Sequence, residues 1–87
     1  MRITSPVVKS REFAGRDDIT TVVISEECRR IEFKAFCYCK NLTSVTVEKS
    51  EDKIAIEFDA FTGCKNLVIF DAQRPIYFFK DVNIRRP

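Results

Sequence analysis

The chain has 87 residues, enough for one small domain with a thin stability margin, because a chain of this length buries only about 60% of its unfolded surface. A hydrophobic content of 45%, with eight phenylalanines, indicates a folded unit and excludes an intrinsically disordered one. The net charge of +2 lacks the basic bias of chains that bind nucleic-acid phosphates, so charge indicates no class of partner.

The first residues, MRITSPVVKSREF, contain no apolar run long enough for a secretory signal peptide. No segment of the sequence reaches the roughly 18 consecutive apolar residues of a membrane span. With Met1 as the native start, we therefore expect a cytoplasmic protein. A longer precursor would instead allow an extracellular location.

Three copies of one pattern follow one another along the chain. The first copy is loose and carries Val8, Phe13 and the run ITTVVI at Ile19 to Ile24. The second and third, IEFKAFCYCKNL at Ile31 to Leu42 and IEFDAFTGCKNL at Ile56 to Leu67, are identical at nine of twelve positions. Their offsets of 23 and 25 residues indicate the stacked coils of a solenoid.

Each copy runs into a strand-like stretch in which apolar residues alternate with polar ones, as in SVTV at Ser44 to Val47. The alternation directs every second side chain into the stack. The inward residues are Val22 and Ile24, Val45 and Val47, and Phe70 and Ala72. Three such strands, spaced about 4.8 Å apart, predict a narrow parallel sheet along one side of the solenoid.

Pairs of phenylalanines three residues apart recur in the second and third copies. The pairs are Phe33 with Phe36 and Phe58 with Phe61. This spacing predicts a short helical or 3-10 turn on the side opposite the sheet. Phe13 stands at the position equivalent to Phe36 and Phe61, so these three rings are expected to stack.

The charged stretch VEKSEDKI at Val47 to Ile54 takes up the two-residue difference between the offsets, as an exposed loop insertion. Beyond Ala72 the pattern weakens into a closing coil. The same register places Phe79 where Ile31 stands and Ile84 where Phe36 stands. We expect one domain over residues 1–87, with an N-terminal coil at 1–24, coils at 25–47 and 48–72, and a C-terminal cap at 73–87.

The run I-E-F-x-A-F-x-x-C-K-N-L followed by a strand closely resembles the BspA-type (bacterial surface antigen) leucine-rich repeat. The matching segments are Ile31 to Val47, Ile56 to Ala72 and, more loosely, Val8 to Ile24. The resemblance implies a right-handed solenoid that binds proteins, often on microbial surfaces and sometimes as an adhesin. The chain departs from the family at Ser25, Glu48 and Gln73, where a proline usually follows the strand.

The expected fold is therefore an α/β solenoid. It is a short, right-handed leucine-rich-repeat stack, with a parallel sheet of about three to four strands and short helical or 3-10 turns on the opposite face.

Cysteines occupy repeat positions, which favours a packing role. Cys39 and Cys64 are equivalent, and free cysteine behaves as a small buried hydrophobic residue. A bridge between these two stays open as an alternative, because residues in the same register on neighbouring coils lie within disulfide range. The absence of histidine and the C-Y-C spacing at Cys37 to Cys39 disfavour zinc. Cys37, equivalent to Thr62, is the thiol expected to be exposed.

Groups that catalysis usually recruits are missing. No histidine is present for acid–base chemistry or for activating a cysteine, and Gly15 and Gly63 are too few for a phosphate-binding loop. Acidic pairs in apparent turns are expected to be solvated loop charges. These pairs are Asp17/Asp18, Glu26/Glu27 and Glu51/Asp52. We therefore expect no enzyme, no cofactor, no metal and no small-molecule substrate.

Outward-facing strand residues form a stripe of small, weakly charged side chains that is expected to bind a partner. The stripe comprises Thr21, Val23, Ser44, Thr46, Ile69 and Asp71. A solvated face without a role is the alternative. The most apolar run, IYFF at Ile76 to Phe79, leaves Tyr77 or Phe78 on the surface and predicts a homodimer through the C-terminal coil.

These features together predict a non-catalytic protein–protein interaction module, with neither nucleic acid nor membrane as its partner. Two alternatives stay open. One is a small intracellular inhibitor, such as a phage-encoded anti-defence (anti-CRISPR-like) protein that blocks a nucleic-acid-handling enzyme. The other is a fragment of a secreted adhesin array.

Overall fold

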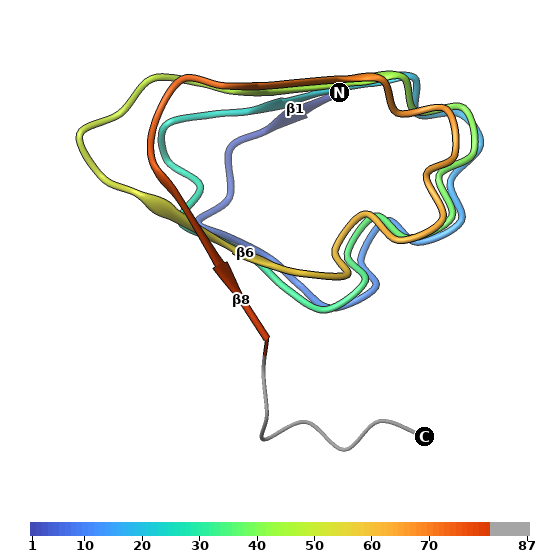
Figure 1. The fold of residues 1–87 in the computed structure, drawn as a ribbon, viewed down its shortest axis with the longest axis horizontal. Helices are drawn as coiled ribbons and strands as arrows, with labels where there is room; N and C mark the ends of the chain where they lie inside the picture. Colours follow the sequence, from blue (N-terminus) through green and yellow to red (C-terminus); the bar gives the residue numbers. More distant parts are fainter. Residues whose placement is uncertain (81–87) are drawn as a thin grey trace.

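The computed structural model describes residues 1–80, in which the chain winds through successive coils stacked along one axis (Figure 1). Two strands of each coil pair with their counterparts in the next coil and build two four-stranded parallel sheets. The first sheet runs in the order β1 (Arg2–Ile3), β3 (Thr21–Ile24), β5 (Ser44–Val47) and β7 (Ile69–Ala72). The second runs in the order β2 (Val7–Val8), β4 (Arg30–Ile31), β6 (Ile54–Glu57) and β8 (Ile76–Phe79).

The first sheet has the register that the repeat predicts. Thr21 pairs with Ser44, and Ser44 pairs with Ile69. The inward residues of β3 and β5 are buried, namely Val22, Ile24, Val45 and Val47. Phe70 and Ala72 continue the same inward register on β7 but are exposed, because β7 is the last strand of the sheet among the described residues.

The expectation of helical or 3-10 turns is wrong, because Phe33–Phe36 and Phe58–Phe61 lie in non-helical turns that follow the strands β4 and β6 of the second sheet. Residues 1–80 contain no helix, and hence none that could cross a membrane. In β6, Ile54 and Ile56 are buried and Ala55 is partly exposed, which is the alternation of a strand. In the turns that follow β4, Lys34 and Tyr38 have positive φ angles of 52° and 58°. Left-handed residues at this spacing redirect the chain after each turn, so a helix cannot propagate.

The third side of each coil consists of turns, and hydrogen bonds join the turns of successive coils. The Phe36 N–H donates to the carbonyl oxygen of Ala60 at 2.8 Å. The side-chain amide of Asn66 donates to the carbonyl oxygen of Lys40 at 2.7 Å, and Asn41 makes the equivalent bond one coil earlier. The K-N-L part of the repeat therefore ties each coil to the one before it.

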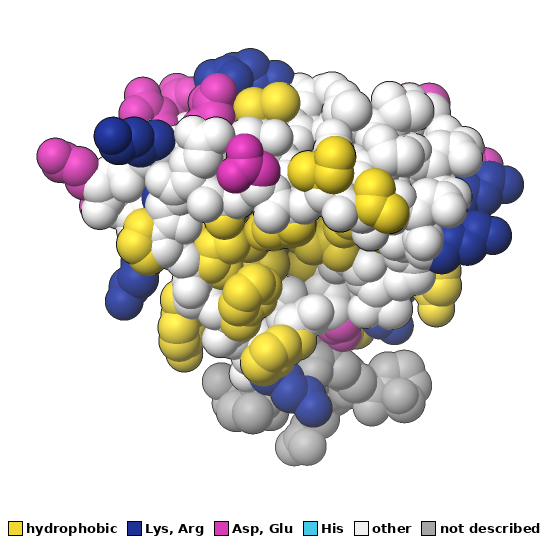
Figure 2. Space-filling view, turned by 45° about the horizontal axis from the view of Figure 1, so that its top comes forward, with side chains coloured by type: hydrophobic (Ala, Val, Ile, Leu, Met, Phe, Trp, Pro, Cys, Tyr) yellow, Lys and Arg dark blue, Asp and Glu magenta, His cyan; other side chains and the backbone are white. Residues whose placement is uncertain are grey.

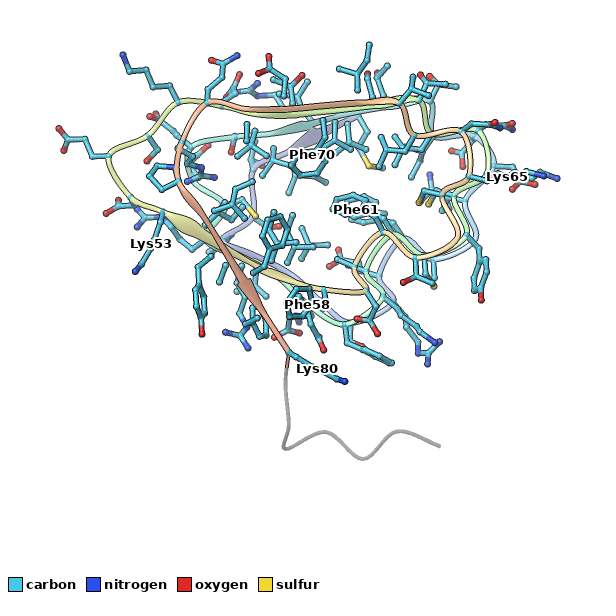
Figure 3. All side chains as sticks on the ribbon, viewed as in Figure 1. Lys53, Phe58, Phe61, Lys65, Phe70 and Lys80 are labelled. Carbon is cyan, nitrogen blue, oxygen red and sulfur yellow. The ribbon has the colours of Figure 1, made fainter. Side chains whose placement is uncertain are left out.

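A stack of phenylalanine rings runs through the interior and confirms the predicted stacking. Phe36 lies 5.2 Å from Phe13 and 5.2 Å from Phe61, measured between ring centroids, with the rings nearly parallel. Phe70 meets Phe61 edge to face at 5.7 Å, and Figure 3 shows both side chains inside the last coil. We call Phe13, Phe36 and Phe61 the phenylalanine stack.

The predicted loop insertion is confirmed by the register, and a buried arginine fills the corner beside it. The β3–β5 offset is 23 residues and the β4–β6 offset is 25, so the two extra residues lie in the loop at 48–53, which bulges outward in Figure 1. Arg74 is 5% exposed. Its guanidinium donates to the carbonyl oxygens of Ser25 at 3.0 Å and Cys28 at 2.6 Å, two coils away.

The last coil corrects the predicted register by one residue. β8 pairs Phe78 with Ile56, so Phe78, and not Phe79, occupies the place of Ile31. The cause is the short turn between β7 and β8, which makes the offset between β6 and β8 only 22 residues. Ile84, expected at the place of Phe36, lies outside the described residues.

Replacing Phe36 with alanine is expected to lower the free energy of unfolding by about 3–5 kcal/mol, because the ring is buried and stacked on both faces. Phe58, which is 69% exposed, is the matched control, and its alanine variant should lose much less stability. Urea denaturation followed by circular dichroism measures both. Equal losses for the two variants would contradict the stacked arrangement.

Candidate interaction surfaces

The outer face of the first sheet carries all six residues of the predicted binding stripe. Strand pairing aligns them in two rows across the sheet, Thr21–Ser44–Ile69 and Val23–Thr46–Asp71. Each of the six is exposed or partly exposed. The structure therefore brings the predicted residues together on one continuous surface. The backbones of β3 and β5 are fixed, because each of these strands pairs with a neighbour on both sides.

An ion pair lies at one edge of this stripe. The row of Val23 begins at Arg2, whose guanidinium donates to both carboxylate oxygens of Glu48 at 2.8 Å. The hydrogen bond lowers the pKa of Glu48 and raises that of Arg2 from their ordinary values. Both side chains are solvated, so this pair positions charge beside the stripe and contributes little stability.

A second surface, on the outer face of β8, combines Tyr77, which the sequence singles out as exposed, with Phe79, Arg30 and Lys53, which it does not single out. The rings of Tyr77 and Phe79 stack at 6.3 Å. The Arg30 guanidinium lies 4.4 Å from the Phe79 ring centre, and the Lys53 ammonium lies 5.9 Å from that of Tyr77. Aromatic and arginine side chains are enriched in protein interfaces. The sequence signal for this surface is the alternation in IAIE and IYFF. It indicates an outward face only once both segments are recognised as strands of a second sheet.

Apolar side chains also gather at the end of the stack formed by the last coil. Figure 2 shows them filling a recess on the side that carries the C-terminal strands. Phe70 is 38% exposed and Phe78 is 50% exposed, although both hold inward positions. Phe58 stacks on Phe78 at 6.3 Å. Tyr77 is also exposed, so both residues predicted for self-association lie on the surface.

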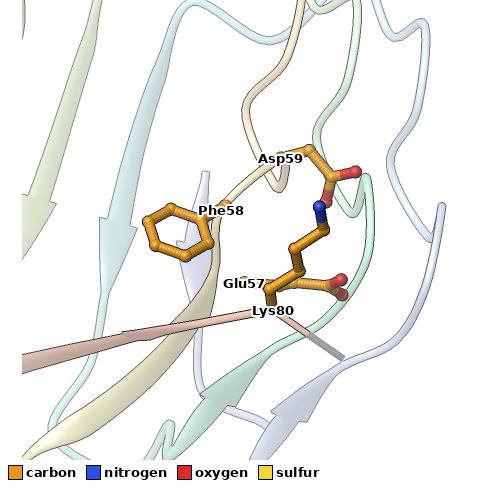
Figure 4. A pocket seen from close by; sticks show the side chains of 4 residues that line it. All are labelled: Glu57, Phe58, Asp59 and Lys80. Atoms are coloured by element: carbon orange, nitrogen blue, oxygen red, sulfur yellow. The ribbon is translucent and has the colours of Figure 1, made fainter. Parts of the chain in front are cut away.

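Carboxylates line part of two hollows, and one of these hollows holds two of the three predicted acidic pairs. One, of about 380 Å³, lies between the β3–β4 and β5–β6 loops and is lined by Glu26, Glu27, Arg29, Ser50, Glu51 and Asp52. Arg29 and Asp52 form an ion pair there at 2.8 Å. The other, also about 380 Å³, is lined by Glu57, Phe58, Asp59 and Lys80 (Figure 4). Within the described part of the chain, no group of metal-ligating residues could hold an ion.

All four cysteines are buried and free, which corrects the expectation that Cys37 is exposed. Cys37 is 2% exposed, and backbone hydrogen bonds join its turn to the coils on both sides, from Gly15 to Cys37 and from Tyr38 to Thr62. The Cys64 thiol donates to the carbonyl oxygen of Phe36 at 3.0 Å, and Cys39 bonds to Phe13 in the same way at 3.2 Å. Cysteine at this repeat position is therefore apolar enough for the core and still satisfies a buried carbonyl.

Burial raises the pKa of the thiols of Cys28, Cys39 and Cys64, so little thiolate forms at neutral pH. The native protein is expected to react slowly with a thiol reagent and to yield four thiols after denaturation. Asp71→Cys, which adds an exposed thiol on β7, is the control and should add one fast-reacting group. A fast-reacting thiol in the native wild type, or fewer than four after denaturation, would contradict this description of the core.

Comparison with known proteins gives a family match over nearly the whole stack of coils. The family model described as "BspA type Leucine rich repeat region (6 copies)" matches residues 7–82. That span includes β2 to β8, with the phenylalanine stack and the asparagine and cysteine positions of the turns. No curated protein and no solved structure matches the chain.

Proposed function

Since the chain belongs to the BspA type leucine rich repeat family, we propose that it is a non-catalytic module that binds another protein. The outer stripe of the first sheet is the proposed contact surface. One observation carries this assignment: the six outward side chains are aligned by strand pairing into a continuous, weakly charged face on which only Ile69 is a large apolar residue.

The rigidity of this face supports binding. β3 and β5 pair with neighbours on both sides, and the side chains beneath them are fully or almost fully buried. A partner that docks there meets a surface that is already ordered, so little conformational entropy is lost on association. Small side chains let the partner's own larger groups approach the sheet closely.

The stripe alone is smaller than the roughly 800 Å² that each partner commonly buries in a stable complex. Two neighbouring features extend it. Val68, directly before β7, is 80% exposed, and the loop at 48–53 projects beyond the corner of the stack (Figure 1). A protein surface broad enough to touch the stripe and this loop fits the site better than a short peptide.

The finer hypotheses stay predictions. Inhibition of a nucleic-acid-handling enzyme and membership of a surface adhesin array both require a partner of known identity. Dimerisation through Tyr77 and Phe78 is a separate proposal that concerns the end of the stack, where β7 also carries the last two stripe residues.

Thr46→Arg and Ile69→Arg are each expected to weaken partner binding by at least about tenfold, because each places a long charged side chain within the contact surface, Thr46 on the middle strand and Ile69 on β7. The partner is first captured from the native host with the wild-type chain, and affinities are then measured with the purified partner.

Thr62→Arg is the matched control, since it introduces the same side chain at an exposed position on the turn side of the stack. It should bind like the wild type. Full affinity in both stripe variants would remove the stripe from consideration, and an equal loss in the control would indicate an unspecific effect of charge.

A further inference from the structure

The last coil leaves two strand edges without a partner among residues 1–80. β7 pairs only with β5, and β8 pairs only with β6. Each strand therefore presents one row of backbone N–H and C=O groups at the end of the stack. Such edges form hydrogen bonds readily with another strand, so soluble proteins usually cover or block them.

The surface between these two edges is apolar. Phe70 and Phe78 face inward at 38% and 50% exposure, and Phe58 beside them is 69% exposed. Together the three rings expose on the order of 300 Å², given about 200 Å² for a whole side chain. This is a substantial part of the roughly 800 Å² that a standard interface takes from each partner. The strand edges and the rim of the coil can supply the rest.

The opposite end of the stack also has two strand edges, on β1 and β2, but it carries a charged pair beside Phe13 and its inward aliphatic residues are buried. The Arg16 guanidinium lies 5.9 Å from the ring centre of Phe13, the first ring of the phenylalanine stack. Asp18 holds it in place by accepting two hydrogen bonds, at 2.8 and 2.7 Å. Ile3 and Val8, the inward residues of the first coil, are already buried. Docking the apolar end here would desolvate the ion pair without replacing its water, which disfavours head-to-tail filaments.

We propose that the apolar end binds the same end of a second copy of the chain about a twofold axis beside the turn Gln73–Pro75. A twofold axis in the plane of the coil reverses the direction in which the chain winds. β7 of one copy therefore runs antiparallel to β8 of the other, and the reverse pair forms by symmetry. The two strands have four residues each, so the free edge of β7 can pair along its whole length with the free edge of β8 of the second copy.

The inward and outward faces match in this arrangement. The inward residues are Phe70 and Ala72 on β7, and Ile76 and Phe78 on β8. Pairing about the turn places Phe70 opposite Phe78 of the second copy, and Ala72 opposite Ile76 of the second copy. Apolar residues thus meet apolar residues inside the joined stack, and aromatic cross-strand pairs add stability to antiparallel sheets.

Charge does not oppose this contact. Asp71 is the one charged residue on the two strands, and it lies opposite Tyr77 of the second copy. Arg74, nearest the axis, directs its guanidinium toward the carbonyl groups of the second coil and away from the open end. The contact therefore brings together no pair of like charges on the strands.

Sedimentation velocity on the full chain tests the dimer. The wild type should dimerise with a concentration-dependent sedimentation coefficient, and Phe78→Lys should raise the dissociation constant by about thirtyfold or more, because it introduces an unpaired charge into the contact. Thr4→Lys, an exposed substitution in the first coil and outside both proposed surfaces, should dimerise like the wild type. A wild type that stays monomeric, or a Phe78→Lys variant that dimerises normally, overturns the proposal.

Cysteine crosslinking tests the register. Asp71→Cys and Tyr77→Cys each add one exposed thiol, while the native cysteines are buried. Under mild oxidation, a mixture of the two variants should form a disulfide-linked heterodimer, and neither variant alone should crosslink efficiently. Crosslinking of Asp71→Cys to itself would overturn the pairing of β7 with β8.

Hydrogen exchange on the full chain identifies any other occupant. A monomer with protected β7 and β8 amides would mean that the chain's own residues cover the end. A monomer with unprotected amides would mean that the end is left for a different protein. Either result overturns the proposed self-association. Thr46→Arg lies on β5, away from the free strand edges, so its partner binding does not depend on these outcomes, and a failed dimer and a failed partner surface remain distinguishable.

Discussion

A single coil cannot enclose an apolar side chain, so burial in this protein depends on keeping successive coils in register. Phe36 is fully buried because one phenylalanine lies on each side of it, at 5.2 Å. Phe70 holds an equivalent inward position to Val45 and is 38% exposed, because β7 ends the sheet in the described chain. The same residue type is therefore core or surface according to whether another coil follows. Hydrogen bonds between coils, from strands, turns and asparagines, fix the register.

This constraint also determines which surfaces are available for binding. Pairing fixes the backbone of β3 and β5, so their outward side chains form a rigid face that can bind a partner without reordering. The two ends of the stack are finished differently, with the Arg16–Asp18 ion pair at one and phenylalanines at the other. The proposed partner surface therefore covers the outer faces of β3, β5 and β7, and the proposed self-association surface uses the free edges of β7 and β8, so the two meet at β7.

Sequence periodicity predicts what the coils share. The offsets of 23 and 25 residues determine the register of the first sheet, the phenylalanine stack and the position of the loop insertion. It does not predict conformation inside the turns. The spacing of Phe33 and Phe36 suits a helix, but the positive φ of Lys34 and Tyr38 excludes one. The turn before β8 is one residue shorter than the repeat predicts, which shifts the register of β8 by one position. Neither this shift nor the burial of Cys37 follows from the repeat alone.

Contacts among the three rings of the phenylalanine stack test the account most directly. In a nuclear Overhauser experiment on the selectively labelled full chain, the Phe36 ring protons should give cross-peaks to both Phe13 and Phe61. Phe13 and Phe61 should give none to each other, because Phe36 separates them. A direct cross-peak between Phe13 and Phe61, or the absence of both contacts to Phe36, would contradict the stacked coils.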